Sequence, residues 1–330
     1  MTLRRRSGSL LIITLWLVAI LAVLAVAVAR TLSLEVRLTK YRRAREQARA
    51  LARSGIYLAM QRLAEDAAAP EPDGAVYDWL GDAWALAPSS SDGEPGRWAI
   101  AVPRDAGTGG EVAVEVWDEE RRLSLNAAAA EELARLSGSE TAAHTILDAR
   151  DEPDAAEDRP EDQPPYLAKN SPFAAPEELA DLPGMTPETL ALLTAQTTPY
   201  TETTDALNLN TVSPEVLRAA GLSESAVQLV LRFREGSDGP SAHERDGIFT
   251  APGLAILQAL RDHEGADLTG TADGTLLASR RFGVTSRTFR VAAEGRTERP
   301  AARARIEAVV RREGCGAGRS APCILAWRER

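Results

Sequence analysis

The stretch Arg4-Arg5-Arg6-Ser7-Gly8, followed by SLLIITLWLVAILAVLAVAVA at residues 9–29, decides the fold. The run from Ser9 to Ala29 has 21 residues without charge or proline, about the length at which a helix crosses a bilayer. From Arg30 to Ala69 there is again no proline, and most residues favour helix. We therefore predict one helix from Ser9 to about Ala64, roughly 85 Å long, that spans a membrane and continues as a stalk.

Apolar and small residues recur at steps of three and four along the stalk half of this helix. They are Leu34, Leu38, Tyr41, Ala44, Ala48, Leu51, Gly55 and Leu58. Two interpretations are open. The stripe packs on the chain's own head, or it also packs on the stalks of other subunits.

The basic leader differs from a secretory signal peptide, because its apolar core is longer and runs directly into an amphipathic helix. A leader that ends in glycine just before the apolar run resembles that of type IV pilin-like proteins. The resemblance implies that prepilin peptidase cuts between Gly8 and Ser9 on the cytoplasmic side, and that Ser9 is then N-methylated.

The charge is divided along the chain. Residues 1–65 hold 12 basic and 3 acidic residues, whereas the remainder holds 26 basic and 45 acidic residues. A strongly acidic head is a poor binder of nucleic acid. Seven Lys or Arg in residues 30–49 against three before the span would favour a cytoplasmic head. We nevertheless expect a periplasmic head. The leader is pilin-like, the head contains the cysteine pair Cys315 and Cys323, and the charge rule is weak for long translocated domains.

Strand patterns occur at both ends of the head, with helix signals between them. Residues 97–102, 111–117 and 123–126 read as strands, as do 283–295, 304–311 and 324–327. Between these groups, Thr186-Pro187-Glu188 and Ser213-Pro214-Glu215 are typical helix starts, with a capping hydroxyl, proline at the first position and glutamate in the first turn. This order predicts a helical domain inserted into one sheet, although chain order alone also allows two independent domains.

Several motifs, in order, resemble GspK, the large minor pseudopilin of type II secretion systems. They are YLAKNSPF at 166–173, Glu177-Glu178-Leu179, LNLNT at 207–211, FGVTS at 282–286 and the terminal Trp327-Arg328-Glu329. The resemblance implies an α+β fold: a long N-terminal pilin-like helix, transmembrane and then periplasmic, packed on an antiparallel sheet with a large inserted all-helical domain.

The implied domain organisation has six parts. These are a leader at 1–8, the transmembrane half of the helix at 9–29, its periplasmic half at 30–69, a first part of the pilin-like β domain at 70–125, an inserted helical (SAM-like) domain at 126–280 and the C-terminal strands at 281–330.

The fifth residue after the predicted cleavage site is Ile13. Major pilins and pseudopilins carry a glutamate there, which can pair with the N-terminal ammonium of a neighbour. An unpaired charge in a bilayer costs several kcal/mol. The absence of the glutamate therefore suits a subunit at the tip of a fibre. The alternative is an ordinary membrane span, which needs no charged residue at this position.

The resemblance implies a non-enzymatic function: capping the tip of the periplasmic pseudopilus and helping to start its assembly for protein export across the outer membrane. The implied partners are the minor pseudopilins of I and J type, the major pseudopilin, the inner-membrane assembly platform and prepilin peptidase. The implied location is the inner membrane, crossed once.

A rival function comes from LNLNTVSPEVLRAAGL, which resembles the helix-hairpin-helix modules of competence-type DNA-binding proteins. Those modules bind phosphates through backbone N–H groups at a glycine-rich hairpin. Here the hairpins are Pro183-Gly184-Met185-Thr186 and Ala220-Gly221-Leu222-Ser223, and each lacks the second glycine. With an acidic head, we expect them to be structural.

Cysteine and metal chemistry offer two more candidate sites. Cys315 and Cys323, with seven residues between them, are the only cysteines, and in an exported head such a pair predicts a disulfide. No nucleophile elbow, P-loop or HExxH motif is present. No cofactor is required by the sequence. Calcium is the candidate ion, since the resemblance implies that some family members bind it, and Asp262, Glu264, Asp267 and Asp273 are its candidate ligands. The alternative is a solvated acidic loop that binds no ion.

Overall fold

The structure is a computed structural model of the chain. It describes residues 8–68, 74–82, 84–85, 97–102, 109–150, 169–202, 205–235, 247–313 and 322–329.

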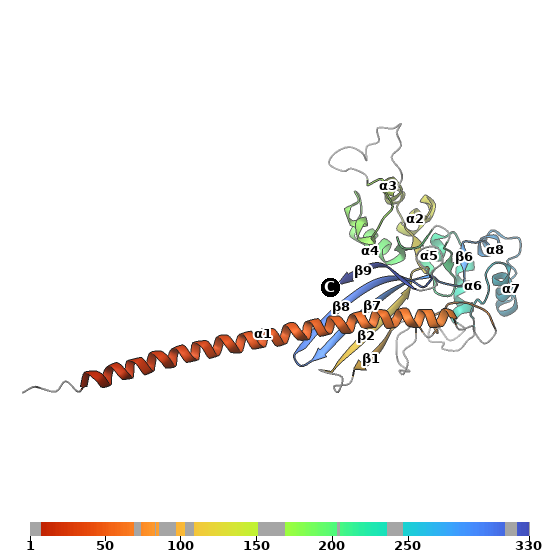
Figure 1. Ribbon diagram of the computed structural model, residues 1–330. Helices are drawn as coiled ribbons and strands as arrows, with labels where there is room; N and C mark the ends of the chain where they lie inside the picture. The colour runs from red at the N-terminus through yellow and green to blue at the C-terminus, as the bar shows by residue number, and fades with distance from the viewer. Residues whose placement is uncertain are drawn as a thin grey trace, which may run out of the picture.

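One helix, α1 (Gly8–Ala68), dominates the shape of the molecule (Figure 1). Its 61 residues correspond to about 90 Å, and it protrudes far beyond the head before its C-terminal half reaches the sheet. The prediction of a single uninterrupted helix is therefore confirmed. It is the one described helix long and apolar enough to cross a membrane, with a mean hydropathy of 3.0 in its most apolar window.

The head is built on a five-stranded antiparallel sheet in the order β1-β2-β7-β8-β9. Its strands are β1 (Arg97–Val102), β2 (Gly110–Asp118), β7 (Thr288–Glu298), β8 (Ala301–Arg311) and β9 (Cys323–Glu329). The central pair, β2 and β7, joins strands from the two ends of the head sequence. The sheet interrupted by an insertion, predicted from the order of the patterns, is confirmed.

The helix α1 covers one face of this sheet and contacts β2, β7 and β8. Its buried residues are small or branched: Ala44, Ala48, Ala52, Ile56, Ala59 and Leu63. They meet alternate residues of the strands, such as Val112 and Val114, which the period of two places on one face.

The predicted stripe along α1 is therefore only partly right. Ala44, Ala48 and Gly55 are buried, whereas Leu34, Leu38 and Tyr41 are 59%, 54% and 51% exposed. The latter three lie in the exposed stretch that ends at Arg43, and no described residue of the chain buries them. Figure 1 shows this part of α1 extending ahead of the sheet. The buried face also includes positions outside the predicted stripe, because the helix sits on a wide sheet surface.

The insertion between β2 and β7 gathers around a second apolar core. Its helices are α2 (Ala130–Ser137), α3 (Glu140–Arg150), the 3-10 helix η3 (Pro176–Asp181), α4 (Pro187–Gln196), α5 (Pro214–Ala219), α6 (Glu224–Glu235), α7 (Leu254–Glu264) and α8 (Ala272–Leu277). The predicted caps are confirmed: Thr186 Oγ1 accepts from the N–H of Thr189, and Ser213 Oγ from that of Val216.

The insertion is not purely helical. Two short parallel pairs are present: β3 (Leu123–Ser124) with β4 (Thr197–Thr198), and β5 (Leu207–Asn208) with β6 (Phe282–Gly283). Each pair joins one end of the insertion to its middle. The expected strand at 283–295 is accordingly divided into β6 and β7, separated by the loop that contains Ser286. The domain boundaries given above stay a prediction.

Candidate functional site

The exposed part of the stalk is the first candidate for function. Every residue from Leu11 to Arg43 is exposed, including large apolar side chains such as Trp16, Leu24 and Leu38. Burying apolar surface stabilises by about 25 cal/mol per Å², so a stalk of this kind is unfavourable in water alone. Residues up to Ala29 suit a bilayer, and those beyond suit a partner. Ile13 lies among the exposed apolar residues, 57% exposed.

The other half of α1 approaches the sheet unusually closely because two glycines leave room. A Cβ placed on Gly295 of β7 would lie 2.0 Å from the backbone oxygen of Ala48. A Cβ on Gly55 of α1 would lie 2.7 Å from the Val112 side chain and 2.9 Å from that of Ala293. The helix can therefore rest almost directly on the strand backbone. This contact fixes the direction in which the head presents the exposed stalk.

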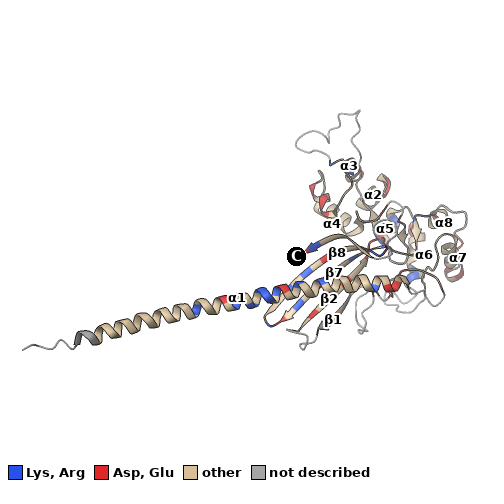
Figure 2. Cartoon of the chain, in the orientation of Figure 1, with Lys and Arg blue, Asp and Glu red and all other residues tan. Residues whose placement is uncertain are grey.

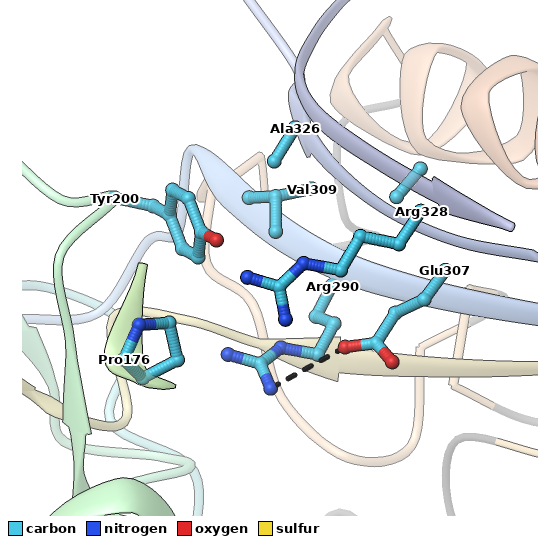
Figure 3. Close-up of a pocket in the computed structure, with 8 residues that line it drawn as sticks. Pro176, Tyr200, Arg290, Glu307, Val309, Ala326 and Arg328 are labelled. Carbon is cyan, nitrogen blue, oxygen red and sulfur yellow. Dashed lines mark ion pairs between the residues drawn. The ribbon is translucent and has the colours of Figure 1, made fainter. Parts of the chain in front are cut away.

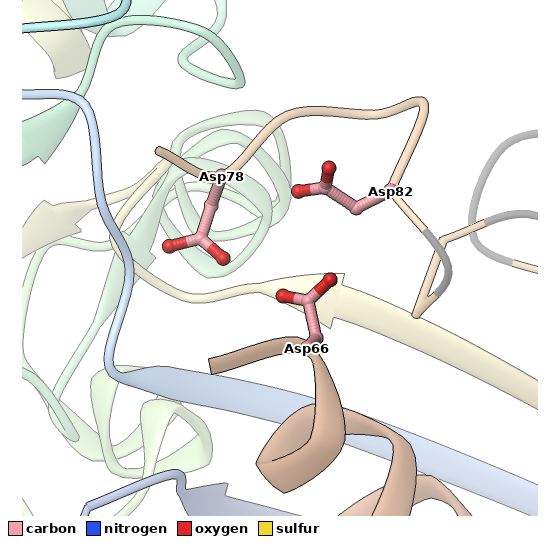
Figure 4. Close-up of side chains that lie close together, drawn as sticks. All are labelled: Asp66, Asp78 and Asp82. Atoms are coloured by element: carbon pink, nitrogen blue, oxygen red, sulfur yellow. The ribbon is translucent and has the colours of Figure 1, made fainter. Parts of the chain in front are cut away.

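The C-terminal end of α1 meets the loop at 74–82 in a cluster of carboxylates (Figure 4). Ligand oxygens of Asp66, Asp78 and Asp82 lie within 4.8 Å of one another, a spacing that could hold a metal ion. Arg312, which follows β8, instead supplies the positive charge. Its guanidinium lies 3.0 Å from Asp66 and 2.5 Å from Asp78, and also donates to the carbonyl of Ser286.

Burial controls the ionisation of this cluster. Although burial alone would lower the pKa of Arg312, the carboxylates of Asp78 and Asp66 raise it. Burial raises the pKa of Asp82 to about 8, and the neighbouring Asp66 and Asp78 charges add to the effect. The Asp82 carboxylate accepts from the backbone N–H of Trp79 and from Trp84 Nε1. Trp84 in turn packs edge-on against Phe289 of β7, 5.1 Å between ring centroids.

A second buried polar group joins the insertion to the sheet. Asp118, the last residue of β2, accepts from Thr211 Oγ1 at 2.5 Å and from Ser286 Oγ at 2.7 Å. Asn208 donates to Asp118 at 3.2 Å, to Ser286 Oγ at 2.7 Å and to the carbonyl of Asp78 at 3.1 Å. The motifs LNLNT and FGVTS thus supply the side chains of one hydrogen-bonded junction.

Two acidic residues that directly follow β2 are buried. Glu119 and Glu120 have exposures of 0% and 3%. Glu120 accepts from the backbone N–H groups of Arg287 and Thr288, and Glu119 pairs with Arg290. Burial raises the pKa of Glu120 well above its ordinary value, and the nearby Asp118 charge raises it further. The only signal for this in the sequence was the position directly after a buried strand.

A small pocket lies between the insertion and the sheet (Figure 3). Tyr200 and Pro176 face Arg290, Glu307 and Arg328 across it. Both arginines already have carboxylate partners: Arg290 pairs with Glu119 and Glu307, and Arg328 pairs with Glu177. The two arginines that line the pocket are therefore neutralised by carboxylates of this chain, and the pocket forms part of the interface between the insertion and the sheet.

The structure does not bring the candidate calcium ligands together as a set. Glu264 pairs with Arg232 at 3.3 Å, and Asp267 pairs with Arg261 at 2.6 Å. Asp273 accepts from the N–H and Oγ of Ser223, and Asp262 is exposed on α7. Within the described ranges, only Asp66, Asp78 and Asp82 meet the spacing for three ligand atoms. Calcium binding at the four candidate positions stays a prediction.

The remaining candidate sites lie at or beyond the limits of the described residues. Gly8 is the first residue of α1. The other side of the predicted cleavage site is Ser9, of whose side chain nothing is described. Cys323 begins β9, but Cys315 lies outside the described residues. The cleavage, the methylation and the disulfide between these cysteines therefore stay predictions.

Comparison with known proteins rests on the fold. No family model and no curated protein matches the chain. Among solved structures, the chain is similar to one described as the crystal structure of the GspK-GspI-GspJ complex from the enterotoxigenic Escherichia coli type 2 secretion system. The match covers 88% of this chain and 99% of the other, with a TM-score of 0.60 and 17% sequence identity. The chain has a GspK-like fold.

The GspK-like fold accounts for the elements described above. Because the match covers 88% of this chain, it cannot be confined to the sheet or to the inserted helices alone. The predicted α+β fold, with a pilin-like helix on an antiparallel sheet and a helical insertion, is confirmed. At this level of identity the likeness concerns architecture, and the roles of individual residues have to be argued from this chain.

Proposed function

We propose that the chain is a minor pseudopilin of a type II secretion system, located at the tip of the periplasmic pseudopilus. The observation that carries the proposal is the GspK-like fold over 99% of the matched chain, including the helical insertion. In this function the protein has no catalytic site. It acts through its surfaces, by holding other subunits along the stalk and by presenting a bulky head.

The exposed stalk supports this proposal. The span up to Ala29 would anchor the subunit in the inner membrane, and the apolar residues Leu32, Leu34, Val36 and Leu38 would contact neighbouring stalks once the subunit leaves the bilayer. The matched structure is a complex of GspK with GspI and GspJ. The partners that we propose here are accordingly the I-type and J-type minor pseudopilins, and then the major pseudopilin and the assembly platform.

The position at the tip is supported by Ile13 and by the width of the head. A glutamate at this position would need an ammonium partner within the bilayer, and Ile13 removes that need. The insertion extends the head sideways from the sheet (Figure 1), so another subunit stacked above would have to pass around it. Assembly beneath this head would push secreted proteins toward the outer membrane.

The alternative of a membrane-anchored DNA-binding protein is disfavoured by one local contact. In a helix-hairpin-helix module the backbone N–H groups at the helix start bind phosphate. Here the N–H of Ser223, just before α6, donates to the Asp273 carboxylate at 2.9 Å. A carboxylate already occupies the direction from which a phosphate would approach, and it would repel one.

The first experiment compares the mass and the N-terminal sequence of the membrane-extracted protein expressed with and without its prepilin peptidase. The proposal predicts a peptidase-dependent start at a methylated Ser9. Gly8→Val should block this cleavage, whereas the neighbouring change Ser7→Ala should leave it intact. Retention of the leader in the presence of the peptidase, or cleavage after Ala29, would contradict the pseudopilin assignment and make DNA binding the next property to measure.

A second experiment addresses the position in the fibre. The processed protein should co-purify with I-type and J-type minor pseudopilins in one complex, and its loss should reduce the number of pseudopili. The same preparation tests for the disulfide. If Cys315 and Cys323 are bonded to each other, reduction increases the mass of the protein by two hydrogens. If the processed protein were found along the whole fibre, the result would support pilin-type processing but contradict the proposed position at the tip.

A further inference from the structure

Positive charge surrounds the stalk from the end of the span to the point where Ala44 first packs on β8. Figure 2 shows this blue segment of α1 ahead of the sheet. Its residues, here called the basic belt, are Arg30, Arg37, Lys40, Arg42, Arg43 and Arg45. All six are exposed, and none of them makes an ion pair within the described part of the chain. Glu35 is the one acidic residue between Arg30 and Arg45.

The belt has no counter-charge of its own, although the head is strongly acidic. Nearby basic residues at the head pair with acids, as Arg53 does with Glu329 and Arg49 with Glu46. The belt begins directly after Ala29, where the span ends, and extends about 22 Å along the helix. Its first residues thus lie in the headgroup layer, and charges beyond about a Debye length of 10 Å from the surface contribute less.

The belt surrounds the helix instead of forming a stripe. At 100° per residue, Arg30, Arg42, Arg43 and Lys40 point in four different directions. A partner helix would contact one face only, as the sheet does further along α1. A headgroup layer, in contrast, surrounds a helix on all sides. The ring therefore fits a lipid surface better than it fits the acidic face of another stalk.

We propose that the basic belt binds anionic phospholipid headgroups around the point where α1 leaves the bilayer. This contact offsets the repulsion between an anionic membrane and the acidic head, whose residues after position 65 include 45 acids and 26 bases. The belt would hold the subunit upright in the membrane before assembly. The inference depends only on the span, so it does not require the pseudopilin function to be correct.

The test uses the full chain reconstituted in vesicles of equimolar phosphatidylcholine and phosphatidylglycerol. Spin-labelled versions of the two lipids report how strongly the protein immobilises each. We expect a preference for phosphatidylglycerol of about fivefold at low salt. Raising the salt to about 1 M should reduce the preference toward one, because the Debye length then shrinks to about 3 Å.

Two triple variants make the comparison specific. Arg30→Gln, Arg37→Gln and Lys40→Gln together, at the three belt residues nearest the span, should at least halve the preference for phosphatidylglycerol. The control, Arg280→Gln, Arg299→Gln and Arg303→Gln, removes the same charge from exposed, unpaired positions on the head and should leave the preference unchanged. Equal association of both lipids with the unmodified protein, or an equal loss in the control, would overturn the proposal. Processing at Gly8 is scored separately, so the two proposals can fail independently.

Discussion

At the scale of single residues, polar side chains of the LNLNT and FGVTS motifs are the buried hydrogen-bonding groups of the junction between the insertion and the sheet. Asn208 illustrates this, because its amide donates to Asp118, Ser286 and the carbonyl of Asp78. A buried acceptor that loses its donor keeps the full cost of its desolvation, about 1–3 kcal/mol for each group. The polar motif therefore has a structural function, which is to join the insertion to the sheet.

Replacing Asn208 by alanine should lower the free energy of unfolding of the head by about 2–5 kcal/mol. The change removes an amide whose two N–H groups lie within hydrogen-bond distance of three acceptors. Asp118 keeps the hydroxyls of Thr211 and Ser286 and the N–H of Glu120 as donors. Thermal unfolding of the detergent-solubilised full chain would measure the loss. Gln228→Ala is the matched control, because its exposed amide donates only to Glu224 and should change stability little. If the two variants lowered the free energy of unfolding equally, the hydrogen bonds of Asn208 would not stabilise the head more than an exposed side-chain contact does.

Asp82 should make stability depend on pH. Its folded pKa of about 8 lies above the unfolded value of about 4, so between these values the folded chain holds a proton that the unfolded chain has lost. The contribution to stability is full below about pH 4 and is lost as the pH rises through about 8, at up to about 1.4 kcal/mol per pH unit.

The substitution Asp82→Asn should therefore flatten the fall in melting temperature between about pH 5 and about pH 9. It leaves an acceptor for the N–H groups of Trp79 and Trp84 while removing the titrating proton. Asp118 and Glu120, whose pKa values burial also raises, should keep part of the slope. Asp262→Asn, at an exposed position, serves as the control. A variant with the slope of the unmodified protein would show that Asp82 is ionised in the folded head throughout this range.

At the scale of elements, the close packing of α1 on β7 depends on glycines, which have no side chain at the points of contact. Gly295→Val should destabilise the head by at least about 2 kcal/mol, because a Cβ there lies 2.0 Å from the Ala48 backbone oxygen and the helix must move. Thermal unfolding provides the measurement. Ala301→Val, at the exposed start of β8, adds two methyl groups without such a contact. If both variants melted alike, the helix would be free to adjust its distance from the sheet.

The same elements show what sequence can and cannot predict. Helix α1, the strands and the Thr186 and Ser213 caps follow from local signals, namely apolar period, absent proline and capping chemistry. The complete buried face of α1 could not be predicted, because small residues such as Ala52 and Ala59 lie outside the predicted stripe and become buried only where a sheet is present. The burial of Glu119 and Glu120 depends on donors about 170 residues away in sequence, which no local pattern encodes.

At the scale of the whole molecule, three parts meet at Arg312. Through its guanidinium it contacts Asp66 at the end of the stalk, Asp78 in the following loop and the carbonyl of Ser286 before β7. Asn208 of the insertion donates to that same Asp78 backbone and to Ser286. The direction of the stalk and the position of the insertion are thus coupled through one buried cation. A rigid coupling of this kind would let a force applied along the stalk act on the whole head.

Removing that cation tests the coupling. Arg312→Leu leaves the buried carboxylate of Asp78 without the guanidinium and removes that contact from the half-buried Asp66, so the free energy of unfolding should fall by about 3–5 kcal/mol. Hydrogen exchange should also accelerate at residues 62–68, the last turns of α1, before it does in the central strands. The variant Arg312→Lys keeps the charge but not the fork of donors, and it should recover part of both losses. Uniform acceleration across the head, with no early release of the end of α1, would mean that Arg312 stabilises the fold without linking the stalk to it.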